Sequence, residues 1–543
     1  MNLELLTLAV GAYAAVLAFL GWLGYRRTRS AADYLVGGRE IHPVLMALAY
    51  GSTFISTSAI VGFAGVAALM GMGLLWLTML NILLGVFVAF VVFGRPTRRL
   101  GAALDAHTFP ELLGRRYRSR FIQGFAGGTI ALLMPLYAAA VLIGGARFLE
   151  VQLQLDYQVA LFVFAVITVG YVLFGGLKGV VYTDAFQAVL MVCGMLVLLV
   201  ATYAQVGGLS AHQALTDLAD KVPPALRAQG HRGWTAMPAA GSPLWWQMVS
   251  TIVLGVGIGV LAQPQLTVRF MTVKSGRELH RALVPGGLFL LLMAGVAYVV
   301  GSLTNLWYFQ RTGKIALAIM TDPATGKPNV DRLMPLYTQA AMPEWFAYLF
   351  MLALLAAAMS TLSAQFHAIG TAIGRDLYEQ AFRLGGGAER TVLLARAGIL
   401  AGFAGTVLLA WNLGPGVIAI ATALFFGMCA ATFLPAFVSA LFWARSTRAG
   451  VIAGMLAGFA AWALWVLFVH ERESAALGVV KALTGRTSLG AGTTWALVDP
   501  IVVALPVSSL VTVVGSLLGR AAPGAEAGAT ARTREGGLDA GLR

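Results

Sequence analysis

Apolar segments of about 20 residues recur along this chain of 543 residues, and they restrict its fold more than any other feature. A helix of that length crosses a hydrocarbon core about 30 Å thick. Only helices and closed barrels span a bilayer, because its interior offers the backbone no water. A barrel needs segments of about ten residues that alternate polar and apolar side chains, and that pattern is missing. The sequence therefore predicts an all-α membrane protein with about thirteen transmembrane helices.

The composition agrees with a lipid environment. Hydrophobic residues make up 59% of the chain and charged residues 11%, which is too apolar for a water-soluble globule of this length. The first segment has no basic region before it and is followed by arginines, so we predict a retained helix rather than a signal peptide. We place the spans near residues 3–25, 43–70, 73–94, 121–146, 157–175, 182–206, 244–268, 282–304, 344–373, 391–411, 416–443, 448–469 and 499–518.

The formal net charge of +14 is explained by topology. Strongly basic proteins often bind nucleic acid, but here Lys and Arg lie mainly in short loops between alternate spans. By the positive-inside rule the side that carries these loops is cytoplasmic, in the inner membrane of a bacterium. An odd number of spans then puts the N-terminus outside and the C-terminus in the cytoplasm. The loops are Arg26 to Arg29, Arg95 to Arg99, Arg115 to Arg120, Arg269 to Arg281, Arg375 to Arg390 and Arg445 to Arg448.

The order of the spans predicts an internal repeat. Spans two to six and spans seven to eleven each contain five helices, so the second group begins from the opposite face, as in many secondary transporters. We therefore divide the chain into a peripheral first helix with its loop (1–41), a first repeat (42–206), an external loop (207–243), a second repeat (244–443), two peripheral spans (444–518) and a disordered cytoplasmic tail (519–543).

The two spans that begin these repeats carry polar residues in their middle. Span two contains the run Gly51 to Ser58, and span seven contains Gln263-Pro264-Gln265. Glycine and proline favour an unwound stretch whose carbonyl groups face a cavity, where an ion or a solute binds. The alternative is that small hydroxyl side chains only let helices approach closely, which is common in membranes. Both interpretations stay open for either span alone.

Span nine offers further oxygen ligands at membrane depth. Ser360, Thr361 and Ser363 lie in an otherwise apolar helix. Hydroxyl groups together with carbonyl groups of an unwound helix can hold a monovalent cation such as Na⁺ without a charged cage. Cys193 and Cys429 have neither CxxC spacing nor nearby ligand clusters, so we predict no disulfide and no other metal site.

Two titratable residues in the spans have two interpretations each. Asp184, near the start of span six, either guides a cation inward or caps its helix beside Thr183. His367, one turn beyond Ser363, either carries protons or packs as a neutral side chain. The sequence contains no Walker A motif, Gly-x-Ser-x-Gly elbow or HExxH pair, so we predict a secondary transporter and not an enzyme.

Three widely separated stretches resemble the solute:sodium symporter family, which includes bacterial proline and pantothenate symporters. They are Gly175-Gly176 with Tyr182 to Gln187 and Met191, Gln263-Pro264 with Arg269-Phe270-Met271, and Met359 to Ser363 with Arg375 to Tyr378. Thr108 to Glu111 and Gly144 to Arg147 add to the resemblance, which covers roughly residues 1–520. It implies a leucine-transporter-like core of five plus five helices, flanked by one N-terminal and two C-terminal helices, that works by alternating access.

The resemblance also implies site residues. The sodium site would use the carbonyl groups of Ser52, Ile55 and Ala357 with the hydroxyl groups of Ser360 and Thr361. A second ion site or exit path would use Asp184 and Ser363, although Ala364 stands where some relatives have a second serine. Substrate contacts would come from Thr53, Phe54, Ser56, Thr57, Ser58, Tyr137 and Gln263.

The resemblance also narrows the substrate. Span seven has Val256 and Val260 where the proline symporter has aromatic residues, and span two looks closer to pantothenate and monocarboxylate relatives. We therefore predict Na⁺-coupled symport of a small monocarboxylate-type anion. An unwound half-helix can hold a carboxylate through its N–H groups, so the prediction includes no buried arginine. The alternatives are a proton-coupled symporter of the same fold and a solute-sensing receptor, against which the short tail without a kinase-like domain argues.

Overall fold

We analysed a computed structural model, which describes residues 3–27, 35–172, 176–320, 326, 328–381, 388–414 and 416–519. Within this part of the chain, eleven helices are long and apolar enough to cross a membrane. One further span is bent by 53° between α3 (Pro43–Phe54) and the segment Ser58–Met70. The fifth predicted span is the shorter helix α9 (Tyr157–Val172). The all-α fold is confirmed, and the predicted tail lies outside the described residues except for Gly519.

The first half of the chain supplies six further spanning segments or parts of them. These are α1 (Leu3–Arg27); η2 (Ser58–Phe63) with α4 (Ala64–Met70); the run η3 (Met72–Leu74), α5 (Leu75–Leu80), η4 (Asn81–Gly94) and α6 (Arg95–Ala103); α8 (Arg120–Leu153); α10 (Gly176–Val206); and α13 (Pro243–Trp246), η7 (Gln247–Val256), α14 (Gly257–Gly259) and η8 (Val260–Ala262). Shorter helices outside the spans include α7 (Phe109–Arg116), α11 (Ala211–Asp217) and α12 (Pro224–Ala228).

The second half begins after a break with α15 (Pro264–Phe270). The spans that follow are α16 (Gly276–Thr312), α19 (Glu344–Thr371) continued by η10 (Ala372–Ala381), α20 (Ala388–Asn412), α21 (Ile418–Phe442), α22 (Arg448–Leu464) with η11 (Trp465–Val469), and α25 (Ile501–Leu518). Short elements between them are α17 (Ala316–Ile319), η9 (Val330–Arg332), α18 (Leu333–Ala341), α23 (Glu471–Leu477) and α24 (Val479–Thr484).

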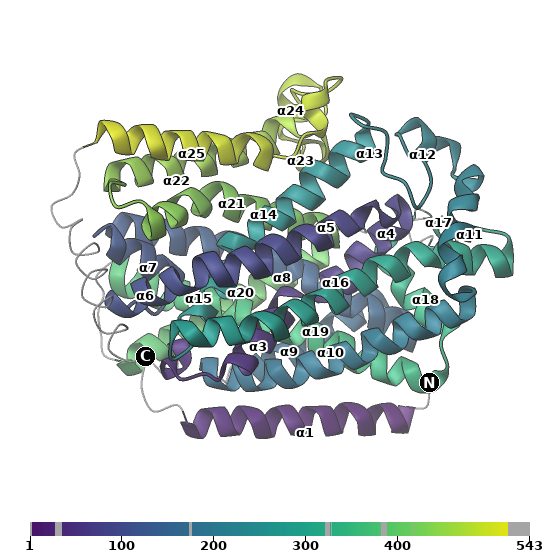
Figure 1. Cartoon of the computed structure of the whole chain (residues 1–543), viewed down its shortest axis with the longest axis horizontal. Helices are drawn as coiled ribbons and strands as arrows, with labels where there is room; N and C mark the ends of the chain where they lie inside the picture. The colour runs from purple at the N-terminus through teal and green to yellow at the C-terminus, as the bar shows by residue number, and fades with distance from the viewer. Residues whose placement is uncertain are drawn as a thin grey trace.

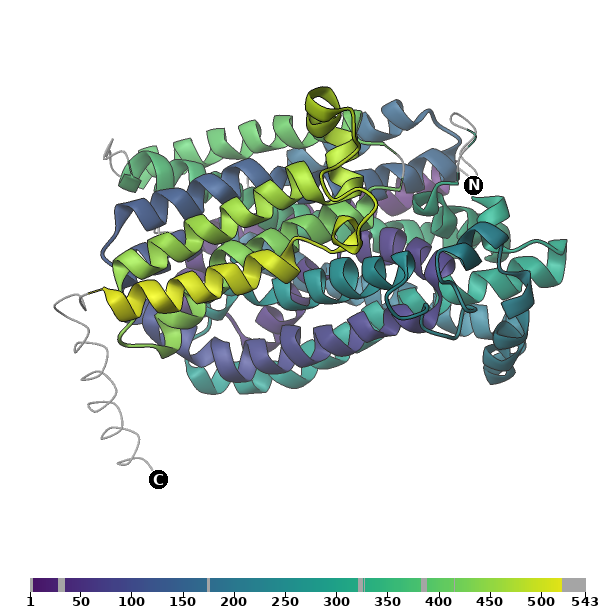
Figure 2. The ribbon, with the colours of Figure 1, turned by 90° about the horizontal axis from the view of Figure 1, so that it is seen from above.

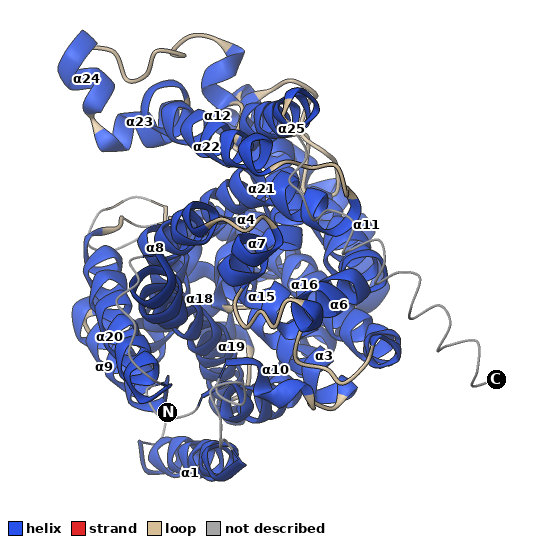
Figure 3. Ribbon diagram, turned by 90° about the vertical axis from the view of Figure 1, so that its left-hand side faces the viewer, coloured by secondary structure: helices blue, strands red, loops and turns tan. Residues whose placement is uncertain are grey.

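The long helices run side by side in one bundle, with α6 and α7 at one end and α11 and α12 at the other (Figure 1). The most apolar window of α21 is 100% buried inside the protein, against 83% for α19 and 72% for α8, so these three helices form its centre. The corresponding share is 17% for α1 and 28% for α25. Both therefore lie at the periphery, and they flank opposite sides of the bundle (Figures 1 and 3).

The last two spans, α22 and α25, pack closely against each other and run side by side in the view from above (Figure 2). Gly450, Gly454 and Gly458 stand four residues apart on α22 and face Ser516, Thr512 and Ser508 of α25. A Cβ atom added at Gly454 would overlap the Thr512 hydroxyl group. Small residues at this spacing let two membrane helices approach until their backbones touch.

Candidate ion and solute site

Two membrane helices are interrupted inside the bundle, as the sequence predicts. α3 ends at Phe54, and Ile55 is extended (φ −87°, ψ 101°) before the chain enters η2. Gln263 is also extended (φ −70°, ψ 117°), and Pro264 begins α15 with no N–H to donate. Both interruptions are buried, so the backbone groups that they free from helical pairing face the protein interior. Such groups are available to an ion or a solute.

Oxygen atoms from α3 and α19 gather at the first interruption. The Ser360 hydroxyl group donates to the Ser52 carbonyl oxygen over 2.9 Å, and the Thr361 hydroxyl group donates to the Thr53 carbonyl oxygen over 3.1 Å. Ser360 also lies 3.3 Å from the Ala357 carbonyl oxygen. All five residues are fully buried. These neutral oxygen atoms suit a hard monovalent cation.

This cluster contains most of the ion ligands that the resemblance implies. Ser52, Ala357, Ser360 and Thr361 come together, whereas Ile55 lies at the interruption, where its N–H group donates to the Gly51 carbonyl oxygen over 2.8 Å. The Thr53 carbonyl group joins the cluster, which sequence reasoning missed. A backbone oxygen carries no side-chain signal, so only the path of the unwound chain reveals it.

The Thr53 side chain belongs to a second group, formed by a buried ion pair. The Arg269 Nη2 atom lies 2.6 Å from an Asp184 carboxylate oxygen and 2.6 Å from the Thr53 hydroxyl oxygen. Ser363 donates to the other Asp184 oxygen over 3.5 Å. The exposed fraction of the Arg269 side chain is 1%, and that of Asp184 is 0%. Charges this deep are retained only when paired.

Two predictions are wrong at this pair. We predicted Arg269 in a cytoplasmic basic loop and no buried arginine near the site, but helix α15 restarts at Pro264 and carries Arg269 inside the bundle against Asp184. The helix-cap interpretation of Asp184 also fails, because α10 begins at Gly176, two turns earlier. Asp184 and Ser363 do meet, as the resemblance implies.

Aromatic side chains form one wall beside the interruptions. The Tyr137 ring stacks on Phe425, with centroids 5.7 Å apart, and meets Phe426 edge to face at 5.2 Å. Phe426 also lies 6.3 Å from Phe54. Phe54 and Tyr137 were predicted substrate contacts, whereas Phe425 and Phe426 of α21 were missed. The only signal in the sequence was two adjacent phenylalanines in an apolar span, which is not specific.

The remaining substrate candidates have different surroundings. Ser56 accepts from the Ser58 N–H group over 3.1 Å, and the Ser58 hydroxyl group is buried with no hydrogen-bond partner in the described part of the chain. The Thr57 hydroxyl group instead donates to the Val141 carbonyl oxygen of α8 over 2.7 Å. Gln263 accepts from Gln265 over 2.9 Å. Thr57 is therefore engaged with a neighbouring helix, while Ser58 keeps its hydrogen-bonding capacity.

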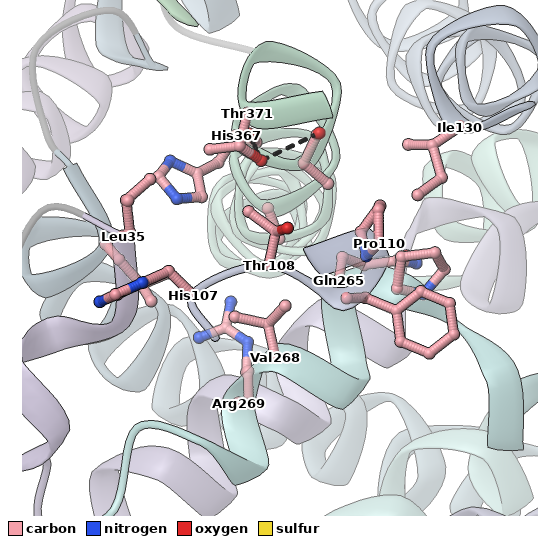
Figure 4. Close-up of a pocket in the computed structure, with 15 residues that line it drawn as sticks. Leu35, His107, Thr108, Pro110, Ile130, Gln265, Val268, Arg269, His367 and Thr371 are labelled. Atoms are coloured by element: carbon pink, nitrogen blue, oxygen red, sulfur yellow. Dashed lines mark hydrogen bonds between the residues drawn. The ribbon is translucent and has the colours of Figure 1, made fainter. Parts of the chain in front are cut away.

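A small cavity lies between this region and the end of the bundle that carries α7. Its walls come from the start of α7, from α15 and from α19, and Figure 4 shows Thr108, Gln265, Arg269 and His367 around it. His367, which was a candidate proton carrier, is a lining residue with 9% of its surface exposed. The cavity therefore lies directly beside Arg269 of the buried ion pair.

The opposite end of the broken span is covered. The Trp234 indole N–H donates to the Ala68 carbonyl oxygen over 2.8 Å, and the Trp234 carbonyl oxygen accepts from the Met72 N–H group over 2.6 Å. Gly65 packs so closely on the Val330 carbonyl group that a Cβ atom would overlap it. The loops around Trp234 and Val330 therefore seal the end of α4.

A family model described as the sodium:solute symporter family matches residues 34–458, which is more than half of the chain. The chain belongs to the sodium:solute symporter family. One relative, the high-affinity proline transporter PutP of Bacillus subtilis, is 26% identical over 451 residues, which cover 82% of this chain and 89% of that protein. The sodium/pantothenate symporter of Haemophilus influenzae is 27% identical over 456 residues, covering 83% of this chain and 87% of the relative.

A solved structure of a Na⁺-coupled sialic acid symporter, in a substrate-bound outward-open state, has the same fold. The TM-score is 0.71 at 19% sequence identity, and the match covers 95% of this chain and 98% of the other. The symporter described here therefore has the leucine-transporter-like fold that the sequence predicts. It is a Na⁺-coupled solute symporter of the bacterial inner membrane with many spans, and it is not an enzyme. Sodium is its coupling ion.

Proposed function

We propose that Na⁺ binds between α3 and α19 and that its binding drives the symport of a small organic anion with one carboxylate. The observation that carries this proposal is the contact of the Ser360 and Thr361 hydroxyl groups with the Ser52 and Thr53 carbonyl groups. α3 opens the first predicted repeat (42–206), and α19 belongs to the second (244–443). A cation that takes ligands from both would tie the two repeats together.

The chemistry of the site supports a cargo with an anionic end and an apolar body. The named substrates of the two relatives, proline and pantothenate, each carry one carboxylate group. Backbone N–H groups at the start of a half-helix favour such a group. Ser58, which follows the first interruption, has an unpartnered hydroxyl group. Phe54, Tyr137 and Phe426 provide an aromatic wall for the rest of the molecule.

We also propose that the end of the bundle with α6 and α7 is cytoplasmic, which puts the N-terminus outside and the C-terminus inside. Arg98, Arg115 and Arg448 gather at this end, as the positive-inside rule requires. The beginning of α1 and the end of α25 lie at opposite ends of the bundle (Figure 1). With this orientation the cavity lies on the cytoplasmic side and the Trp234 loop covers the outer end of α4. We therefore propose that the structure is in an inward-facing conformation.

Uptake into proteoliposomes tests both the coupling ion and the cargo class. Labelled proline, pantothenate, lactate and pyruvate are offered under an inward Na⁺ gradient, an inward proton gradient, or neither. Prolinamide, panthenol and lactamide, which lack the carboxylate, serve as competitors. We expect Na⁺ to drive accumulation of at least one carboxylate, with its carboxylate-free analogue competing poorly. Accumulation that follows the proton gradient alone would contradict sodium coupling, and equal competition by the carboxylate-free analogues would contradict the carboxylate requirement.

A further inference from the structure

The buried Arg269 side chain has more hydrogen-bond donors than the protein satisfies. Its Nη2 atom donates to Asp184 and Thr53, each over 2.6 Å. Its Nε and Nη1 atoms have no hydrogen-bond partner among the described residues, although only 1% of the side chain is exposed. An unpaired donor on a buried charged group is costly, so a native protein rarely leaves one without a reason. A ligand that accepts these hydrogen bonds during the transport cycle would supply the reason.

The cavity in front of Arg269 favours an anion. Arg269 reaches from α15 into the ring of lining side chains (Figure 4). The other ionisable lining residues are His107 and His367, and no aspartate or glutamate is among the fifteen residues drawn around it. Asp184 is not a lining residue, so the cavity meets the guanidinium group and not its counter-ion. Apolar walls that include Leu35 and Leu177 suit the body of a small organic acid.

The geometry of a guanidinium group makes an incoming carboxylate compete with Asp184. A carboxylate forms its strong two-pronged contact with two N–H groups on one edge of arginine. The two available edges are Nε with Nη2 and Nη1 with Nη2, so each of them includes the Nη2 atom that Asp184 and Thr53 now occupy. Asp184 would keep hydrogen bonds from Thr53 and Ser363 if Arg269 turned away from it.

We propose that Arg269 is a carboxylate-binding subsite on the path of the cargo to the cytoplasm, at which the cargo carboxylate displaces Asp184 from the guanidinium group. The inference rests on the proposed function, because it requires a cargo with a carboxylate. It assigns Arg269 to the inward-facing half of the cycle. In the proposed orientation the Trp234 loop covers the outer end of α4, so a cargo would reach this subsite from the cytoplasmic side.

Membrane vesicles of the two orientations measure how carboxylate binding differs between the cytoplasmic and the outer face of the protein. Everted vesicles expose the cytoplasmic face, and right-side-out vesicles expose the outer face. The probe is pantothenate or, if pantothenate is not transported, another carboxylate of the panel that is. Its half-saturating concentration is measured from each side. The test variant is Arg269→Gln/Asp184→Asn, which removes both charges together and leaves no unpaired buried charge. Arg281→Gln is the matched control, because the Arg281 side chain is 74% exposed near the same end.

We expect the double variant to raise the half-saturating concentration at the cytoplasmic face by about tenfold or more, the effect of a lost charge-assisted contact. The outer-face value and both values of Arg281→Gln should change by less than about threefold. Arg269→Lys/Asp184→Asn keeps a point charge, so it should bring the half-saturating concentration at the cytoplasmic face part of the way back to the wild-type value. Equal changes at both faces, or no change at the cytoplasmic face, would overturn this inference while leaving the proposed function standing. Absence of Na⁺-driven uptake of every carboxylate would overturn both.

Discussion

Arg269 of α15 and Asp184 of α10 form an ion pair of 2.6 Å in which neither side chain is more than 1% exposed. Because Thr53 of α3 also accepts from Arg269, this pair joins the two half-helices of the broken spans through one guanidinium group. Withdrawing two charges from water is costly, and their attraction offsets the cost only while both partners are present. The pair therefore constrains the site more tightly than an apolar contact of the same size.

This ion pair predicts a non-additive stability pattern. Arg269→Gln or Asp184→Asn alone leaves an unpaired buried charge, and each should lower the free energy of unfolding by about 3–5 kcal/mol. The double variant should be much closer to wild type, with a coupling energy of at least about 1 kcal/mol. Thermal unfolding of purified protein, followed by size-exclusion chromatography, measures the three variants. Single effects that simply add in the double variant would contradict the pairing.

Glu111 predicts a pH dependence at the proposed cytoplasmic end. Burial by itself raises the pKa of the Glu111 carboxyl, but hydrogen bonds from His107 and Arg375 outweigh it and lower the pKa from 4.5 to about 2. Arg375 lies 2.9 Å and Arg115 2.6 Å from the carboxylate. A depressed pKa in the folded state contributes stability that is present above about pH 4.5 and is lost as the pH falls toward 2.

The Glu111→Gln variant tests this linkage. It should be less stable than wild type near neutral pH. The difference between the two should shrink as the pH falls from about 4.5 to about 2, because the unfolded wild-type chain binds a proton at Glu111 that the folded protein binds only near pH 2. The control is Glu278→Gln, whose ion pair with Arg281 lies at the surface, where such pairs contribute little. A stability difference that stays constant over this pH range would show that Glu111 does not titrate as described.

The close contact at Gly454 predicts that a larger residue there would disturb the packing of the peripheral helices α22 and α25. A Cβ atom at this position overlaps Thr512, so Gly454→Ala should lower the free energy of unfolding by about 1–3 kcal/mol through overpacking. Gly11→Ala in α1, where nothing lies within 4 Å, should be neutral or slightly stabilising. Thermal unfolding of both variants compares them directly. Equal stability of the two variants would mean that the close helix contact is absent.

The contacts of Trp234 predict how the proposed outer end of α4 is kept covered. Its indole N–H donates to Ala68 of α4, and its carbonyl group accepts from Met72 of η3, just beyond α4. Trp234→Ala should therefore increase the rate at which a membrane-impermeant maleimide labels a cysteine placed at Ala68. Trp234→Phe, which keeps an aromatic ring but loses the indole hydrogen bond, should give an intermediate rate. Unchanged labelling in both variants would show that this loop does not cover the end of α4.

The fold was predictable because its signals are local. Apolar length marks the spans, and Pro264 marks one interruption through its missing N–H group. The proposed ion ligands Ser360 and Thr361 were predicted from hydroxyl groups at membrane depth together with the family resemblance, and the structure places both beside the broken α3. Arg269 was misplaced because an arginine after an apolar run looks like the start of a loop. Its partner Asp184 is 85 residues away in the chain, so only the tertiary structure reveals the pair.

The dependence of cargo uptake on Na⁺ concentration tests the central claim most directly. Half-saturating Na⁺ is measured for wild type, for Ser360→Ala, for Thr361→Ala and for Thr406→Ala, whose hydroxyl group bonds within its own helix α20. Loss of a hydroxyl ligand should raise the half-saturating Na⁺ concentration by about tenfold or more in the first two variants, with the Thr406 variant like wild type. Wild-type Na⁺ dependence in both α19 variants would show that the ion binds elsewhere.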